Sequence, residues 1–164
     1  IGGDARLGRV SADDFLVRLV RGCVEIGAFP EVSGGLEMVP VDVTSRAIAA
    51  LVDRPAALGR AYHLGHPEPL DVADAAARAR DAGLDVVLLP YAAWRDRLRA
   101  RVFRGEPSAL APLLNMFPET PPARIDDRRF DAANTRADLG GLGAPPVAAQ
   151  LDRMLRWMRD EGLV

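Results

Sequence analysis

The sequence predicts an α/β fold that is mostly helical and has only two or three short strands. Apolar residues recur at helical spacing in several segments, which is typical of helices that bury one face. The β-type runs are few and short, whereas a free-standing doubly wound sheet would need more of them. With 164 residues, of which 49% are hydrophobic, the chain is long enough for one domain with its own core.

The first predicted helix starts at Ser11 and Asp14, because Ser-x-x-Asp resembles a capping box with Asp in place of the usual Glu. Gly27 is predicted to end this helix. Cys23 lies on the apolar stripe of the helix and has no activating neighbour in the sequence, which predicts a buried and unreactive thiol. Residues 28–35, which include Pro30 and a Gly-Gly pair, are predicted to form a loop.

A short β-type run over Leu36–Val41 stops at Asp42, and a helical pattern begins at once. An aspartate at the start of a helix can accept hydrogen bonds from the free N–H groups of the first turn. We therefore interpret Asp42 as a structural N-cap and not as a catalytic group. Its replacement by alanine is expected to cost about 1 kcal/mol of stability.

Farther along the chain, Arg60–Gly65 and Val86–Leu89 are the other candidates for short strands. Asp71 is predicted to cap a helix that runs through an alanine-rich stretch to Gly83. Further helices are predicted over residues 92–104, 108–117, 131–139 and 147–161.

Three segments are predicted to be irregular. Ile1–Asp4 has no initiator methionine and has the composition of a loop interior, which suggests a fragment of a larger protein. The Pro-rich residues 118–122 cannot form regular structure. The doublets at 126–129, Asp-Asp followed by Arg-Arg, predict a solvated charged turn.

Composition excludes several classes of partner. The net charge is −2 and the pI is about 5.7, so no positive field would attract nucleic acid or an anionic membrane surface. No apolar run has the roughly 20 residues that a membrane span needs. A single cysteine cannot form an internal disulfide, which favours a cytoplasmic location. All basic residues are arginines, so a mechanism that requires a lysine cannot be completed within this chain.

No known catalytic pattern is present in the sequence. There is no Gly-x-Gly-x-x-Gly, no phosphate-binding loop and no serine in a nucleophile elbow. His63 and His66 have a spacing that invites a metal site, but Pro67 follows them and no further His or Cys lies nearby. We therefore predict no metal site and no catalytic residue, and expect the two histidines to meet a carboxylate or solvent.

Four segments resemble, in order, the segments of one known family. Met38–Val43 is similar to its Val-Pro-Val-Asp-Tyr-Val segment, although Val43 stands where the family usually has tyrosine. Gly59–Leu64 is similar to its next strand, and Leu89-Pro90-Tyr91-x-x-Trp94 to its Val-Pro-Tyr-x-x-Trp corner. The last segment, Phe130-Asp131-x-x-Asn134-Thr135 with Gly143-Ala144-Pro145-Pro146, is similar to its Phe-Asp-x-x-Asn-Thr and Cys-Pro-Pro motifs.

This family comprises the terminal thioester reductase domains of nonribosomal peptide and polyketide synthases, which are related to carboxylic acid reductases. It is a branch of the extended short-chain dehydrogenases/reductases. The resemblance implies that residues 1–164 are the C-terminal, substrate-binding subdomain of such a reductase. The N-terminal Rossmann part, which carries the glycine-rich cofactor loop and the catalytic Thr/Ser, Tyr and Lys, would lie outside the chain.

The resemblance also implies a reaction, a cofactor and a partner. Hydride from NADPH would reduce the thioester of an acyl or peptidyl chain held on the phosphopantetheine arm of a carrier protein, and release an aldehyde or an alcohol. Ile1 and Gly2 would lie near the cofactor. The C-terminal part would cover the substrate cleft, with five candidate cleft residues that could equally be core residues: Tyr91, Trp94, Leu113, Met116 and Phe117.

Two other hypotheses remain open at this point. The chain could be a non-catalytic module that docks a carrier protein or another synthase domain. It could also be the C-terminal part of a different extended dehydrogenase, such as a nucleotide-sugar enzyme. The Pro-Tyr-x-x-Trp corner at Pro90–Trp94 favours the thioester reductase over the nucleotide-sugar enzyme.

Overall fold

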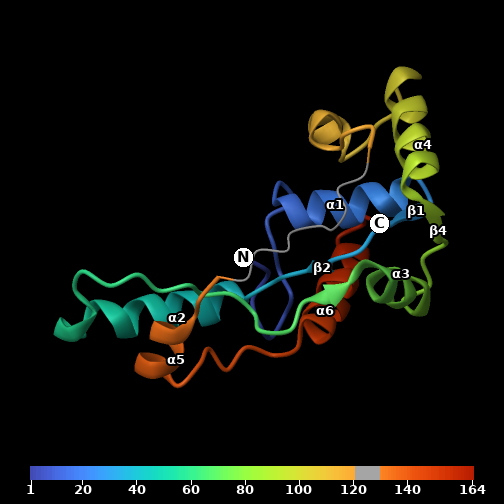
Figure 1. Cartoon of the computed structure of the whole chain (residues 1–164). Helices are drawn as coiled ribbons and strands as arrows, with labels where there is room; N and C mark the ends of the chain where they lie inside the picture. Colours follow the sequence, from blue (N-terminus) through green and yellow to red (C-terminus); the bar gives the residue numbers. More distant parts are fainter. Residues whose placement is uncertain (121–129) are drawn as a thin grey trace.

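The computed structural model describes residues 1–120 and 130–164. Its main body contains a two-stranded parallel sheet, in which β1 (Ala28–Glu31) pairs with β4 (Val87–Pro90). Around this sheet lie the helices α1 (Phe15–Glu25), α3 (Val72–Asp81), α4 (Tyr91–Phe103) and α6 (Val147–Asp160) (Figure 1). The helices α1, α3 and α4 pack against β1, and α6 packs against α3. These elements share one continuous core that includes the fully buried Trp94, Leu98 and Met158.

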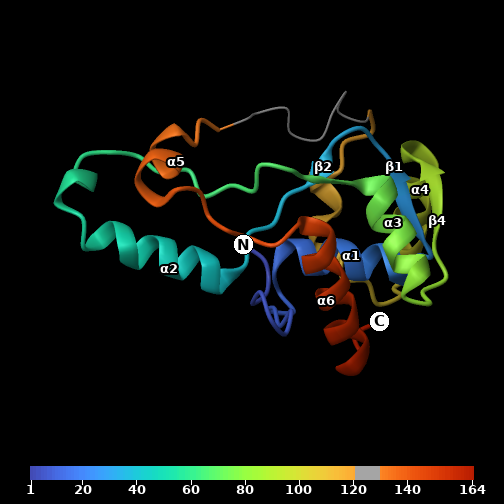
Figure 2. The same cartoon turned by 90° about the horizontal axis from the view of Figure 1, so that it is seen from below.

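A smaller part of the chain projects from the main body as an arm (Figures 1 and 2). In the arm, α2 (Val41–Val52) and α5 (Ala133–Leu139) lie side by side in both views, and the short 3-10 helix η1 (Pro55–Ala57) follows α2. The chain enters the arm after β2 (Gly35–Leu36) and leaves it before β3 (Leu70–Asp71). β2 and β3 pair antiparallel, so these two of the connections between arm and body are hydrogen-bonded to each other, and the chain returns to the arm for α5.

The first predicted helix forms, but it begins three residues later than the capping-box pattern at Ser11 predicts. Asp14 is its N-cap, and the Asp14 carboxylate accepts a hydrogen bond from the N–H of Leu16 at 2.9 Å. Gly27 follows the helix with φ of 66°, a conformation that glycine adopts without strain. The side chain of Cys23 is fully buried, and burial raises the pKa of its thiol to about 12. Cys23 is therefore a neutral core residue, as predicted.

The predicted loop over residues 28–35 is wrong in its first half, where Ala28–Glu31 form β1. Pro30 has no N–H to donate, but β1 has a single strand partner within the described residues, and an edge strand tolerates proline. The indole N–H of Trp94 donates to the carbonyl of Ala28 at 3.2 Å and anchors the strand from α4. The strand partner and this anchor lie far away in the sequence, so the local composition of residues 28–35 did not indicate a strand.

The predicted strand at Arg60–Gly65 is also wrong, since no strand forms there. Side chains of α5 occupy carbonyls that a neighbouring strand would use. The amide of Asn134 donates to the carbonyl of Ala61 at 2.9 Å, and the hydroxyl of Thr135 donates to the carbonyl of His63 at 2.9 Å. The segment is extended and is held by a helix.

Asp42 is not the N-cap of α2, contrary to prediction. The helix begins at Val41 and its N-cap is Pro40, which makes no side-chain cap. Asp42 lies in the first turn, and its carboxylate accepts a hydrogen bond from the N–H of Ala5 at 2.7 Å and pairs with Arg46 at 2.9 Å. These bonds, led by the one from Ala5, lower the pKa of Asp42. Asp42 is thus a structural residue that ties the N-terminal loop to the arm.

The remaining helix predictions agree with α3, α4, α5 and α6 to within a few residues. Asp71 is the N-cap residue of α3, but its side chain makes no capping hydrogen bond. The segment predicted as a helix at 108–117 contains a 3-10 helix instead, η2 (Ala111–Met116). Residues 118–120 are irregular as predicted, whereas residues 121–122 and the predicted charged turn at 126–129 lie outside the described residues. No helix within 1–120 and 130–164 combines the length and apolar character that crossing a bilayer requires.

Candidate functional site

A groove of about 1590 Å³ opens on the described part of the molecule, and side chains from both the body and the arm line it. From the body come one face of α1, the segment from Phe29 to Glu37, the start of α4 and the end of η2. From the arm and its connections come residues 63–72, two residues of α5 and the segment from Gly140 to Pro146. The groove is therefore assembled from segments that are far apart in the sequence.

One side of the groove, which we call the apolar wall, consists of residues from α1, β1, α4 and η2. These residues are Leu16, Leu19, Val20, Cys23, Phe29, Tyr91, Trp94 and Phe117. The rings of Trp94 and Phe117 meet edge to face with centroids 5.0 Å apart, and Tyr91 lies against Trp94 at 5.9 Å. The hydroxyl of Tyr91 donates to the carbonyl of Pro118 at 2.8 Å.

The other side, which we call the polar wall, contains Glu37, His63, His66, Thr135 and Arg136. The ring of His66 is oriented by two backbone groups, because its Nδ1 accepts from the N–H of Glu68 at 3.1 Å and its Nε2 then donates to the carbonyl of Pro145 at 3.1 Å. The Glu37 carboxylate accepts from the backbone N–H of His66 at 2.8 Å. Glu37 and His66 are thereby fixed relative to each other.

His63 is oriented in a similar way. Its Nδ1 lies 2.8 Å from the carbonyl of Asp131 and so must carry the proton, and its ring stacks on Phe130 with centroids 5.0 Å apart. This tautomer leaves Nε2 as a hydrogen-bond acceptor. His63 is exposed to solvent, as predicted, and both rings also meet backbone carbonyls, which the sequence did not indicate. No group of three or more His, Cys, Asp or Glu side chains able to hold a metal ion occurs in the described part of the chain.

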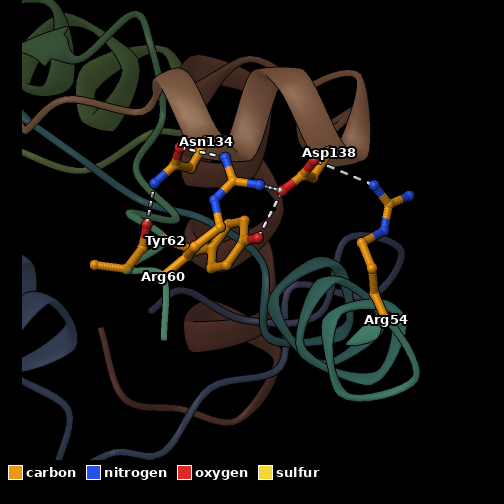
Figure 3. Close-up of polar contacts among 6 residues, drawn as sticks. Arg54, Arg60, Tyr62, Asn134 and Asp138 are labelled. Carbon is orange, nitrogen blue, oxygen red and sulfur yellow. Dashed lines mark hydrogen bonds and ion pairs between the residues drawn. The ribbon is translucent and has the colours of Figure 1, made fainter. Parts of the chain in front are cut away.

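A polar cluster attaches α5 to the segment that follows α2, and Figure 3 shows its members. The carboxylate of Asp138 accepts from the hydroxyl of Tyr62 at 2.6 Å and pairs with Arg60 at 2.6 Å and with Arg54 at 3.3 Å. Arg60 also donates to the side-chain oxygen of Asn134. We call these five residues the α5 clamp. The hydrogen bond from Tyr62, with the neighbouring arginines, lowers the pKa of Asp138, and the same bond raises the pKa of Tyr62.

The α5 clamp holds the part of the polar wall that α5 contributes. Thr135 and Arg136 of α5 line the groove, and so does the glycine-rich segment 140–143 that follows the helix. Gly140 ends α5 with φ of 68°, which directs the chain out of the helix along the groove. Because α5 has only seven residues, it relies on such tertiary contacts for its position.

Four of the five predicted cleft residues line the groove, namely Tyr91, Trp94, Met116 and Phe117. Tyr91 and Trp94 are buried, whereas Met116 is 60% exposed. Leu113 does not line the groove and packs against the hydrophobic core instead. Its position in a 3-10 helix, where side chains repeat every three residues, differs from the one that an α-helix would give it.

The two residues predicted to lie near the cofactor border a different hollow. Ile1 is 68% exposed, and the N–H of Gly2 donates to the carbonyl of Val39 at 2.8 Å. Both lie beside a hollow of about 370 Å³ that Arg9, Val10, Ser11, Asp14 and Val41 complete. Within the described residues, the predicted cofactor and substrate residues therefore do not share one cavity.

Several residues of the groove have no separate signal in the sequence. Leu16 and Leu19 have the same helical spacing as the core residues of the first helix, and both line the groove from α1. His63 and His66 were considered as metal ligands, and their actual position on the polar wall was not predicted. The Phe-Asp-x-x-Asn-Thr motif was the available signal for the arm side, since Phe130 and Thr135 both line the groove.

Known proteins resemble this chain in sequence and in fold. No protein-family model matches the chain. The chain is 35% identical over 160 residues to the L-2-aminoadipate reductase of Saccharomyces cerevisiae, an alignment that covers 88% of this chain and 11% of the relative. It is 36% identical over 122 residues to the non-canonical nonribosomal peptide synthetase FrzA of a Cladobotryum species, which covers 71% of this chain and 12% of the relative.

Two solved structures have the same fold. The terminal R domain from the myxalamid PKS-NRPS biosynthetic pathway matches 99% of this chain and 42% of its own length, with a TM-score of 0.85 and 29% identity. A thiolation-reductase di-domain from an archaeal non-ribosomal peptide synthetase matches 98% of this chain and 34% of its own, with a TM-score of 0.70 and 13% identity.

The fold is therefore that of a reductase of the extended short-chain dehydrogenase/reductase class. Within this class, the chain belongs to the family of terminal reductase domains of nonribosomal peptide and polyketide synthases, and it matches the C-terminal part of such a domain. The chain spans 11% and 12% of the length of the two curated relatives described above.

Proposed function

We propose that this chain is the substrate-binding portion of an NAD(P)H-dependent thioester reductase, which releases a carrier-bound acyl or peptidyl chain as an aldehyde or, after a second reduction, as an alcohol. The observation that carries this proposal is the groove of about 1590 Å³, found in a chain that shares 99% of its length with a terminal R domain. The names of the relatives, which are reductases and a peptide synthetase, favour a reductase over a non-catalytic docking module.

The groove has the properties that a thioester on a long flexible arm requires. Its apolar wall offers the partly exposed Leu16, Leu19 and Phe117 to the acyl chain, with Tyr91 and Trp94 packed behind them and Met116 at a more exposed position. On the polar wall, the Nε2 atom of His63 can accept a hydrogen bond from an amide N–H of the phosphopantetheine arm. Holding the thioester between the two walls would orient its carbonyl and exclude water from the reaction.

The proposed cofactor is NADPH, and the chain would meet only part of it. In this proposal one end of the dinucleotide would lie at the hollow beside Ile1 and Gly2, and the rest would be bound outside this chain, because no glycine-rich phosphate loop is present in the sequence. When bound, NADPH would supply the hydride that reduces the thioester carbonyl. The carbon–sulfur bond of the resulting hemithioacetal then breaks, the thiol leaves with a proton, and the aldehyde is released. The proton donors of this step would belong to the N-terminal Rossmann part.

The proposed partners are an acyl or peptidyl carrier protein and the N-terminal Rossmann part of the same reductase. The printed name of one structural neighbour, a thiolation-reductase di-domain, supports the first partner. The share of the solved R domain that this chain matches, 42%, supports the second, because more than half of that domain lies outside the match. The lone, buried cysteine suits the cytoplasm as the place of the reaction.

The proposal is tested with the intact reductase that contains these residues. Carrier protein loaded with an acyl-phosphopantetheine group is expected to cause NADPH oxidation, followed as loss of its near-ultraviolet absorbance. The matched control is the same carrier with an unacylated arm, which should cause none. The isolated 164-residue chain is expected to bind no NADPH. If no acyl-carrier causes NADPH oxidation, or if the isolated chain binds NADPH saturably, the proposal is wrong.

A further inference from the structure

We propose that the apolar wall of the groove selects the acyl chain, and that it accepts uncharged, apolar chains and rejects chains that end in a carboxylate. The inference rests on the proposed function and adds a substrate class to it. It follows from the lack of free hydrogen-bond donors, acceptors and charges on the apolar wall.

The polar atoms of the apolar wall are already used within the protein or are neutral. The indole N–H of Trp94 donates to the carbonyl of Ala28 at 3.2 Å, and the hydroxyl of Tyr91 donates to the carbonyl of Pro118 at 2.8 Å. The thiol of Cys23 is fully buried and neutral. A ligand that reaches this wall therefore finds no free donor or acceptor among these three side chains.

The rest of the apolar wall is hydrocarbon. Leu16 and Leu19 of α1 and Phe117 after η2 are partly exposed and present only carbon atoms from their side chains, with the buried Phe29 of β1 packed behind them. Phe15 also lines the groove and is 44% exposed, although phenylalanine usually avoids water. An apolar acyl chain would cover this surface and gain from the removal of water on both sides.

The nearby cations cannot neutralise a carboxylate at this wall. Arg95 and Arg97 of α4 do not line the groove, and they donate to the carbonyls of Phe117 at 2.8 Å and Ile26 at 3.2 Å, respectively. Within the described residues, the one arginine that lines the groove is Arg136 on the polar wall, 3.9 Å from the carboxylate of Asp131. A carboxylate at the chain end would therefore lose its water at this wall without gaining a partner, which is strongly unfavourable.

The test compares two pantetheine thioesters of equal chain length in the intact reductase. One carries an octanoyl chain, and the other carries the same chain with a terminal carboxylate. We expect kcat/KM for NADPH oxidation to be about 100-fold higher for the octanoyl thioester, the order of discrimination that binding can supply against an unpaired polar group. Equal kcat/KM values would overturn this inference and leave the proposed function standing. No turnover of either thioester would overturn both.

A single substitution tests whether the apolar wall causes the preference for the octanoyl thioester. Leu19→Arg places a cation on α1 at the groove, and it is expected to reduce the preference for the octanoyl thioester at least tenfold by pairing with the carboxylate. The matched control is Leu58→Arg, because Leu58 is 84% exposed and does not line the groove. The control should retain the original preference. If both variants change the preference equally, or if Leu19→Arg is folded and leaves it unchanged, the apolar wall does not select the chain.

Discussion

The packing of α1 against Leu110 can be tested by adding one methyl group. Gly22 is buried in α1, and a Cβ atom added there would lie 2.2 Å from Cγ and 2.7 Å from Cδ1 of Leu110, which is itself fully buried. These distances are far below normal contact between carbon atoms, about 3.5–4.0 Å. The substitution Gly22→Ala therefore forces Leu110 to move, because the atom that it meets first is the branch point of the leucine and not its flexible end.

Two opposing effects determine how much Gly22→Ala changes the free energy of unfolding. Alanine is favoured over glycine inside a helix by about 1 kcal/mol. Overpacking a close-packed core costs about 1–3 kcal/mol, and the 2.2 Å distance argues for the upper part of this range. We expect Gly22→Ala to lower the free energy of unfolding by about 2 kcal/mol. Leu110 directly precedes η2, so the shift should also reach Phe117 and raise KM for the thioester.

Native-state hydrogen exchange of the α1 amides measures the loss as a lower free energy of opening. Leu110→Ala alone should cost about 2–5 kcal/mol, but less in the Gly22→Ala background, because the added methyl group fills part of the cavity. Ala100→Gly on the exposed side of α4 is the control for helix propensity and should cost about 1 kcal/mol. A stabilised Gly22→Ala protein, or additive effects of the two substitutions, would refute the close contact.

Three further predictions concern single side chains. Cys23, whose thiol pKa is raised to about 12, should resist iodoacetamide at pH 8 in the folded protein and react fully in urea, as mass spectrometry would detect. Asp138→Asn should lower Tm at neutral pH, because the ionised carboxylate holds Tyr62 and the two arginines. The pKa of Asp138 lies below its ordinary value of 3.8, so the Tm difference between variant and wild type should be full above pH 3.8 and should vanish as the pH falls through the lowered pKa. Unchanged Tm values at pH 7 would contradict the α5 clamp. Asp42→Ala should lower the free energy of unfolding by about 1 kcal/mol and speed hydrogen exchange at the Ala5 amide, which loses its acceptor. The NADPH affinity of the intact reductase should not change. A large loss of NADPH affinity without destabilisation would refute a purely structural role of Asp42.

Most helices of this fold could be predicted from the sequence, because helices such as α1 and α6 are amphipathic and lie between local start and stop signals. α1 illustrates this, with Asp14 at its start and Gly27 after its end. The strands could not be predicted as well, because their stability depends on distant partners. β1 contains Pro30 and is paired with β4, and the segment Arg60–Gly65 is held by side chains of α5 and not by another strand.

The groove was predictable only in part. The Pro-Tyr-x-x-Trp corner correctly indicated Tyr91 and Trp94, because the residues that resemble a family's motif also lie together in the structure. The contribution of α1 could not be separated from its core stripe, since Leu16 and Leu19 have the same spacing as residues that face the interior. Asp42 was misassigned as a cap because its true partner, the N–H of Ala5, is brought to it only by the tertiary fold.

The most direct test of the central claim follows a hydride from cofactor to product. The intact reductase that contains these residues is given an octanoyl-loaded carrier protein and NADPH deuterated on the transferred face of the nicotinamide, and the released product is analysed by mass spectrometry. A thioester reductase places one deuterium on the carbonyl carbon of the aldehyde, or two on the same carbon of the alcohol. Release of unlabelled octanoic acid, or no release at all, would contradict the assignment of this chain to a reductive release enzyme.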